Sequence, residues 1–278
     1  MGVLNVTPDS FSDGGMFFSA KAAVERALEM LEEGAAIVDI GGESTRPGAQ
    51  PVSAQEEMDR VLPVIEAVLG ARAGSLISVD TYKAETARAA VRAGAEIVND
   101  VSGLVWDAAM AAACAELHCG VVAMHTRGRP SAWKTQPRLD PDEVLPLVRD
   151  GLQQQLEQAQ AAGLERERVV LDPGFGFGKV GEENYPLLAG MDELLALGRP
   201  LVAGLSRKSF LGRTLAGPNS SAALPVGERG NASLAATTAA ILAGASVVRV
   251  HDVRPALEAA RIADAILAAD RFGDPVRG

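Results

Sequence analysis

Short apolar runs that end in polar or charged residues recur along the whole chain. They lie at 1–4, 36–40, 76–79, 96–98, 120–124, 169–171, 200–205 and 246–248. The polar residues that follow them include Asn5, Asp80, Asn99, His125, Asp172, Lys208 and Arg249. Runs of this length between turn signals are typical of buried strands. A polar residue after nearly every run predicts strand ends that converge on one functional face.

Stretches rich in Ala, Leu and Glu separate these runs and have helical spacing. They predict helices at 19–33, 53–68, 83–93, 142–162, 184–197, 230–243 and 255–269. Ser53 and Glu56 have the spacing of a capping box, and glycine follows most of the expected helix ends. Alternating strands and helices predict an α/β protein, a single (β/α)8 TIM barrel with its site at the C-terminal ends of the strands.

The length and composition of the chain fit one such barrel. The 278 residues are 47% hydrophobic, enough to bury a large core. We expect the domain to span 1–270 and residues 271–278 to fray. The sequence has no apolar run of about 18 residues and no basic-then-apolar segment at its start. These features predict a cytoplasmic protein with no membrane partner.

The net charge of −10 disfavours nucleic acid as a partner, and we expect none, because no basic stripe is present to meet the phosphates. It does not describe a local pocket, and Arg46, Lys208 and Arg249 are candidates to gather around an anion. Cys114 and Cys119 are closely spaced. We interpret them as idle thiols rather than as a disulfide or a metal pair.

Four loops are too long and too rich in functional groups to be plain connections. They are GVLNVTPDSFSDGG at 2–15 (with its first strand), GGESTRPG at 41–48, DPGFGFGK at 172–179 and SRKSFLG at 206–212. The third is no nucleotide phosphate loop, because Val180 follows Lys179 where Ser or Thr is required. Residues 126–136 carry more basic side chains than expected, and we predict a flexible surface loop there.

These motifs, together with RVHD at 249–252, resemble the dihydropteroate synthase family. The resemblance runs from Gly2 to about Asp270, and the first two motifs are long and specific. It implies a transferase of folate biosynthesis. Such an enzyme condenses 6-hydroxymethyl-7,8-dihydropterin diphosphate with 4-aminobenzoate and yields 7,8-dihydropteroate and diphosphate.

The resemblance implies a pterin slot at the strand ends. Its lining would be Asp80, Asn99, Met124, Asp172 and Lys208, with Asp172 deepest. A carboxylate can accept two hydrogen bonds from the N–H groups along a pterin edge, and an asparagine offers both a donor and an acceptor. Asp80 can instead cap the next helix. His125 is either catalytic or a satisfied histidine under its loop.

The leaving group requires cations and donors. The resemblance assigns diphosphate to Asn5, Arg46, Arg249 and His251. Arg249 and His251 are two apart on the expected last strand, so they would point the same way. Asn5 can give its amide oxygen to Mg²⁺, the expected cofactor, or form a turn before Thr7.

The resemblance also places the second substrate and the groups that assist bond breaking. Thr45, Pro47, Phe177 and Ser209 would bind 4-aminobenzoate. Asp9, Phe11 and Asp13, with Arg46 and Lys208, would be catalytic, and Asp9 or Asp13 would stabilise the developing cation or bind the metal. We also expect a homodimer built from the apolar faces at 235–242 and 256–267, although these faces can equally just cover the barrel.

Two other functions have sequence features against them. A pterin-binding methyltransferase barrel would have no use for Arg46 and Pro47 or for the SRKS motif. A non-catalytic pterin-binding homologue would be expected to lose residues of the first two loops, and here both motifs are complete.

Overall fold

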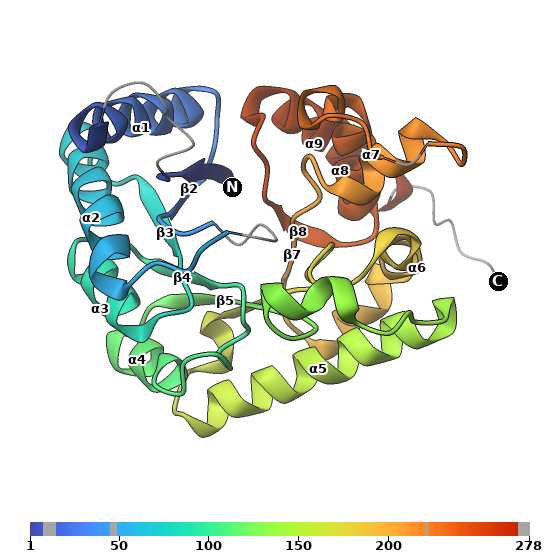
Figure 1. Ribbon diagram of the computed structural model, residues 1–278, viewed down its shortest axis with the longest axis horizontal. Helices are drawn as coiled ribbons and strands as arrows, with labels where there is room; N and C mark the ends of the chain where they lie inside the picture. Colours follow the sequence, from blue (N-terminus) through green and yellow to red (C-terminus); the bar gives the residue numbers. More distant parts are fainter. Residues whose placement is uncertain (8–14, 45–48, 221, 272–278) are drawn as a thin grey trace.

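The computed structural model in Figure 1 describes residues 1–7, 15–44, 49–220 and 222–271. Eight strands form one parallel sheet in the order β1 to β8. They are β1 (Gly2–Asn5), β2 (Ile37–Gly41), β3 (Leu76–Asp80), β4 (Ile97–Asp100), β5 (Gly120–Met124), β6 (Val169–Asp172), β7 (Leu201–Ala203) and β8 (Ala245–Val248). Each apolar run overlaps one of these strands, so the predicted α/β order is confirmed.

The sheet is curled, so that its two edge strands approach each other. Gly2 of β1 forms an isolated parallel bridge with Val250, just beyond the end of β8. The amide of Val3 donates to the carbonyl of Val250, and that of Val250 to the carbonyl of Met1, both at 2.9 Å. The helices lie outside the curl (Figure 1).

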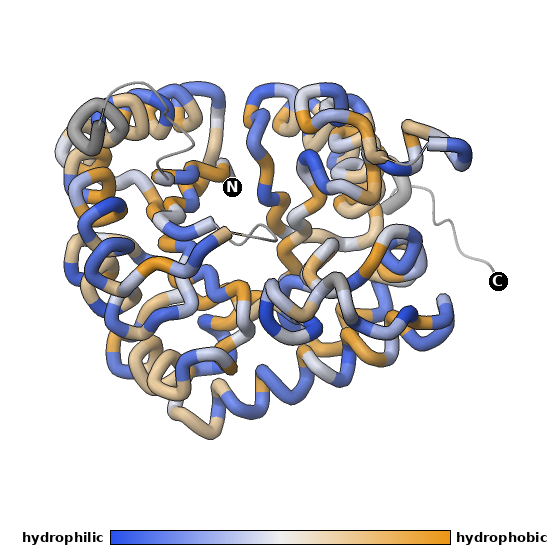
Figure 2. The backbone as a smooth tube through the Cα atoms, viewed as in Figure 1, coloured by the Kyte–Doolittle hydropathy of each residue, from blue (hydrophilic) through white to orange (hydrophobic). Residues whose placement is uncertain are grey.

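The helices of the described residues cover the outer face of the sheet. They are α1 (Gly15–Glu32), α2 (Ala54–Ala71), α3 (Ala84–Arg92), α4 (Met110–Leu117), α5 (Pro141–Ala161), α6 (Asn184–Ala189), α7 (Ser209–Ala216), α8 (Gly230–Leu242) and α9 (Val253–Arg271). Short 3-10 helices are η2 (Pro130–Thr135), η3 (Arg166–Arg168), η4 (Gly181–Glu183), η5 (Met191–Leu197) and η6 (Val226–Glu228). Figure 2 shows hydrophobic positions along the strands and hydrophilic ones along α5. The core lies between these layers and includes Ile40, Ile65, Ile77, Leu152 and Leu171.

Helix ends follow the local sequence signals only in part. Ser53 caps α2 by accepting a hydrogen bond from the amide of Glu56 at 3.1 Å. The Glu56 side chain pairs with Arg60, so the structure shows one half of the predicted capping box. At the start of α5, the amide of Asp140 donates to Oε2 of Glu143 at 2.9 Å, which is the other half of such a box.

Two predicted elements differ from the structure. Residues 206–212 were expected to form a loop, but α7 begins at Ser209 because Phe210 and Leu211 give it a buried face. The expected helix at 184–197 is interrupted at Gly190, which separates α6 from η5. Glycine has high conformational freedom, and this weakens a helix at that position.

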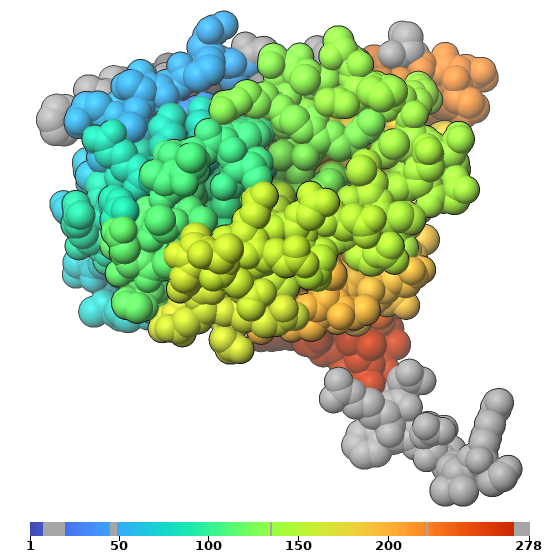
Figure 3. Space-filling view, turned by 90° about the horizontal axis from the view of Figure 1, so that it is seen from below, coloured from blue at the N-terminus to red at the C-terminus, as the bar shows by residue number. Residues whose placement is uncertain are grey.

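The segment between β5 and α5 also differs from the predicted surface loop. It contains η2, and the side chain of Trp133 is only 6% exposed. The indole nitrogen of Trp133 donates to the carbonyl of Gly128 at 2.9 Å. Figure 3 shows residues near 130, in green, along the upper edge of the molecule, far from the end of α9 in red.

Other expectations concern single residues and the ends of the chain. Cys114 and Cys119 are both buried free thiols. Within the described ranges, no helix combines the length and apolarity needed to cross a bilayer. The predicted frayed tail lies almost entirely outside the described residues.

Candidate functional site

Polar side chains from β2, β3 and β4 form one hydrogen-bonded group with an arginine near the carboxyl end of the sheet. The Nε of Arg249 donates to Oδ2 of Asp39, and its Nη2 donates to Oδ2 of Asp80, each at 2.6 Å. Nδ2 of Asn99 donates to the same oxygen of Asp39 at 2.9 Å. The parallel register pairs Asp80 with Asn99, which explains why residues far apart in the sequence lie together. We call Asp39, Asp80, Asn99 and Arg249 the Arg249 cluster.

Asp39 is the member that sequence reasoning missed. It lies inside β2, within an apolar run, so a search for polar residues after the runs overlooks it. The residue is fully buried, and its Oδ1 has no hydrogen-bond partner among the described residues. A buried acceptor without a donor is costly in a folded protein. The Arg249 cluster therefore keeps one unpaired carboxylate oxygen among the described residues.

The alternative interpretation of Asp80 as a helix cap is wrong. Helix α3 begins at Ala84, and the amide of Ala84 donates to Oδ2 of Asp107 at 2.8 Å. Burial raises the pKa of Asp80 to about 7, although Arg249 opposes the shift. Burial would lower the pKa of Arg249, but the attraction of Asp39 and Asp80 outweighs it, so that pKa is raised.

Asp172, at the end of β6, is the second buried carboxylate of the site. Its Oδ1 accepts a hydrogen bond from the amide of Gly174 at 2.7 Å. Gly174 has φ of 69°, and a Cβ there would lie 1.9 Å from the carbonyl oxygen of His125, so only glycine fits. Burial raises the pKa of Asp172, opposed by the Gly174 amide and by Lys208.

Lys208 brings a positive charge to the same space. Burial lowers the pKa of Lys208 to about 8, and the charge of Asp172 opposes this shift. The ammonium of Lys208 lies 4.0 Å from the centre of the Phe177 ring, a cation–π contact. Met124, at the end of β5, is in register with Asp172 and is buried. The predicted pterin residues therefore lie at neighbouring strand ends.

The predicted diphosphate residues at the last strand lie just beyond β8 rather than in it. Nδ1 of His251 lies 3.0 Å from Oγ of Ser206, which also accepts the amide of His251 at 3.2 Å. Burial, followed by the charges of Arg207 and Arg249, lowers the pKa of His251 to about 4. His251 is therefore neutral near pH 7 and oriented by Ser206.

The remaining predicted residues divide into two groups. Asn5 is the last residue of β1, and Ser209 is the first residue of α7. Six others lie outside the described residues, and the structure gives no test of them: Asp9, Phe11, Asp13, Thr45, Arg46 and Pro47.

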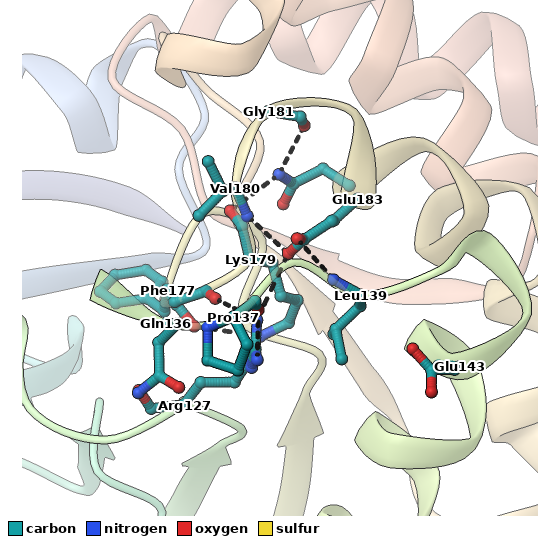
Figure 4. A network of polar contacts seen from close by, with 12 residues as sticks. Arg127, Gln136, Pro137, Leu139, Glu143, Phe177, Lys179, Val180, Gly181 and Glu183 are labelled. Carbon is teal, nitrogen blue, oxygen red and sulfur yellow. Dashed lines mark hydrogen bonds and ion pairs between the residues drawn. The ribbon is translucent and has the colours of Figure 1, made fainter. Parts of the chain in front are cut away.

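A second charged cluster lies beside the site (Figure 4). Glu183 accepts the amides of Leu139 at 3.1 Å and Val180 at 2.7 Å, and Arg127 lies 3.5 Å from it. Nζ of Lys179 lies 3.1 Å from Nδ1 of His125. We call Arg127, His125, Lys179 and Glu183 the Arg127 cluster.

Burial lowers the pKa of His125 to about 2, and the charges of Lys179 and Arg127 add to the shift. The imidazole is held by Lys179 and is only 6% exposed. Of the two interpretations made from the sequence, the satisfied histidine under its loop is the one that this geometry favours.

The fold and site together define an α/β enzyme with buried carboxylates and cations at the strand ends. A family model described as pterin binding enzyme matches residues 1–251. The chain belongs to this family, and its relatives include dihydropteroate synthases.

The relatives are similar over nearly the whole chain. Dihydropteroate synthase of Escherichia coli (strain K12) is 44% identical over 97% of this chain and 92% of its own length. A mitochondrial folate synthesis bifunctional protein of Pisum sativum is also 44% identical, but the chain spans only 53% of its length. A structure of Xanthomonas albilineans dihydropteroate synthase with 4-aminobenzoic acid is 42% identical with a TM-score of 0.86, covering 96% of this chain and 92% of that one.

Proposed function

We propose that this protein is a dihydropteroate synthase. It condenses 6-hydroxymethyl-7,8-dihydropterin diphosphate with 4-aminobenzoate, giving 7,8-dihydropteroate and diphosphate in folate biosynthesis. The observation that carries the proposal is the group of polar side chains at neighbouring strand ends, where Asp80, Asn99 and Asp172 lie with the Lys208 ammonium close by. The names of the relatives and the aminobenzoate-bound neighbour support the same reaction.

The proposal includes a closed (β/α)8 barrel over residues 1–270. The bridge between Gly2 and Val250 and the hydrogen bonds of Met1 and Val3 with Val250 support closure. Closure brings the ends of β1 and β8 together. It thereby places Asn5 on the same rim as Arg249 and His251.

The pterin lies among the buried carboxylates. Acceptors for its N–H and amino groups come from Asp172, Asp80 and Asp39. The amide of Asn99 pairs with a part of the ring edge that has both a donor and an acceptor. Lys208 donates to the ring oxygen or a ring nitrogen. Met124 provides an apolar contact for the flat ring face.

The diphosphate lies at the rim. Arg249 already uses Nε and Nη2 for Asp39 and Asp80. Its remaining nitrogen, Nη1, and the imidazole of His251 face the leaving group in this proposal, with Arg46. The charge on Arg249 makes these hydrogen bonds to an anion strong.

The proposed cofactor is Mg²⁺, and the donor chemistry fits it. Among the described residues, no group of three or more His, Cys, Asp or Glu could hold a metal. Mg²⁺ is commonly bound by one or two protein oxygens together with phosphate oxygens and water, and Asn5 supplies such an oxygen. When bound, the ion neutralises charge on the diphosphate. Asp9 or Asp13 is a further candidate ligand.

In the reaction, the bond from the pterin methylene carbon to the diphosphate oxygen breaks. The pair of electrons leaves with diphosphate, and the dihydropterin delocalises the positive charge. Arg249 and His251 hold the departing anion, and the fixed carboxylates along the ring edge favour the cation; this is electrostatic preorganisation. The amine of 4-aminobenzoate then bonds to the carbon and loses a proton.

The 4-aminobenzoate ring packs on Phe177 in this proposal, beside Thr45 and Pro47, with its carboxylate near Ser209. Phe177 is half-buried, so part of its ring is available to a ligand. Its contact with Lys208 places this ring next to the pterin residues.

We also propose a cytoplasmic homodimer. Leu242 of α8 and Ile262 and Ile266 of α9 are 42%, 63% and 49% exposed, so these helices keep apolar surface after covering the sheet. The free thiols of Cys114 and Cys119 suit a reducing compartment. Light scattering tests the dimer, and a monomer mass at micromolar concentration would count against it.

Diphosphate release, measured with and without 4-aminobenzoate, tests the reaction. A dihydropteroate synthase releases diphosphate together with dihydropteroate only when both substrates are present. A methyltransferase or a non-catalytic pterin-binding protein releases none in either case. If the folded protein releases no diphosphate in the presence of both substrates and Mg²⁺, the proposal is wrong.

A further inference from the structure

The segment between β5 and α5 has no part in the reaction described above, yet it is tied to the loop that carries Phe177. The amide of Arg127 donates to the carbonyl of Phe177 at 3.3 Å, and Nη1 of Arg127 donates to that of Gly178 at 3.1 Å. Nε2 of Gln136 closes the segment by donating to the carbonyl of Arg127 at 2.9 Å. Figure 4 shows these contacts converging between the two loops.

The backbone around Phe177 does little to fix its ring. Phe177 stands between Gly176 and Gly178, whose φ values are 81° and 75°. Glycine is conformationally permissive, so the orientation of the ring depends on what packs against it. The close approach of Gly178 to Arg127, where a Cβ would lie 2.5 Å from the Cβ of Arg127, fixes the backbone but not the ring.

Among the described residues, the Phe177 ring has a cation–π contact and an aromatic contact. The ammonium of Lys208 lies 4.0 Å from its centre, and the Trp133 ring packs against it with a centroid distance of 5.1 Å and an interplanar angle of 87°. Such edge-to-face packing is directional. Trp133 is itself fixed, because its indole N–H donates to the carbonyl of Gly128 and lies 3.2 Å from Oγ1 of Thr126.

We propose that Trp133 is a positioning residue for 4-aminobenzoate binding, because it sets the orientation of the Phe177 ring on which that substrate packs. This inference rests on the proposed function. The ring contact of Trp133 is with Phe177, and the pterin residues Asp80, Asn99 and Asp172 take no part in it. Its effect should therefore be selective for one of the two substrates.

Steady-state kinetics of Trp133→Leu test this selectivity. Losing the directional ring contact should raise the KM for 4-aminobenzoate about fivefold. The KM for the pterin diphosphate should stay within about twofold. Trp133→Phe keeps a ring edge and should restore most of the affinity.

A double-mutant cycle separates positioning from general destabilisation. If Trp133 acts through Phe177, adding Trp133→Leu to Phe177→Leu should change the KM for 4-aminobenzoate by less than about twofold. If Trp133→Leu does not fold, judged by thermal unfolding, Trp133→Met fills the space without a ring and takes its place.

The outcomes distinguish the two proposals. An unchanged KM for 4-aminobenzoate, an equal rise for both substrates, or fully additive effects in the cycle would overturn the role of Trp133 while the proposed reaction stands. A folded wild-type protein that forms no dihydropteroate overturns the proposed function itself.

Discussion

The Arg249 cluster and the Arg127 cluster both join an arginine to buried carboxylates at the carboxyl end of the sheet, but they differ in what is left unpaired. In the Arg249 cluster, Oδ1 of Asp39 has no partner among the described residues. In the Arg127 cluster, both oxygens of Glu183 accept backbone amides, from Leu139 and Val180.

The remaining donors of the Arg127 cluster are also used within the protein. Arg127 donates to the carbonyls of Pro137 at 2.9 Å and Gly178 at 3.1 Å, and Lys179 donates to that of Phe177 at 3.3 Å. These bonds join two loops. The Arg127 cluster therefore links two loops through a carboxylate whose oxygens are both paired, whereas the Arg249 cluster keeps an unpaired carboxylate oxygen beside the pterin residues.

Replacing each arginine should have the largest effect on the two clusters. Arg249→Ala leaves Asp39 and Asp80 without their counter-ion, and Arg127→Ala does the same to Glu183. Because removing one partner of a buried pair is costly, each change should lower the free energy of unfolding by about 3 kcal/mol. Only Arg249→Ala should also lower pterin diphosphate affinity, by about 100-fold.

Denaturant unfolding and calorimetric titration measure the two effects. Titrations are made at a temperature where both variants remain folded. A loss of pterin diphosphate affinity in Arg127→Ala as large as in Arg249→Ala would contradict the division of the two clusters into binding and structural roles.

The next largest effect should come from Asp172→Asn. The substitution keeps the shape of the side chain but replaces one acceptor with a donor, which would face the pterin donors. Mismatched buried polar groups cost on the order of 1–3 kcal/mol, so we expect pterin affinity to fall at least about tenfold while the fold survives. Wild-type affinity in the folded variant would remove Asp172 from the pterin site.

The strand order and the location of the site could be predicted from the sequence, because both depend on local patterns. Each apolar run supplies a strand, and residues such as Asp80 and Asp172 close their strands as expected. In a parallel sheet, these ends lie on one side. The apolar runs and the polar residues that follow them were therefore enough to predict the strand order and the side of the sheet on which the site lies.

Features that depend on packing between distant segments could not be predicted. Asp39 was overlooked because its partners, Asn99 and Arg249, are distant in sequence. Trp133 was assigned to a surface loop because its contact with Phe177 has no local signature. The break at Gly190 was missed because an isolated glycine does not always end a helix.

Pterin affinity should depend on pH, because a carboxyl group of the Arg249 cluster titrates near neutral pH. Burial raises the pKa of Asp80 to about 7, so its carboxylate gains a proton as the pH falls below that value. A protonated carboxyl loses acceptor capacity, and pterin affinity should fall about fivefold between pH 7 and pH 6. A pterin without diphosphate is the appropriate ligand, because phosphate ionisation then plays no part.

The matched variant for this titration is Asp80→Asn, which cannot titrate at that position. Its pterin affinity should be lower than that of the wild type but nearly constant between pH 6 and pH 7. If Asp80→Asn keeps the full pH dependence, another group titrates and Asp80 is not the cause.

The smallest effect on ligand affinity should come from Asn5, whose side chain is a neutral amide. Asn5→Ala removes the only proposed metal oxygen that lies in the described residues, yet water can replace it in the coordination of Mg²⁺. We therefore expect only about a threefold loss of diphosphate affinity in the presence of Mg²⁺. With a chelator present, the variant and the wild type should bind diphosphate alike, since Arg249 and His251 remain. Calorimetric titration of both proteins under both conditions gives the four affinities. The ratio of the diphosphate affinity with Mg²⁺ to that with chelator should be smaller in Asn5→Ala than in the wild type. If the two ratios are equal, Asn5 is not a metal ligand, and the diphosphate site of the described residues consists of Arg249 and His251 alone.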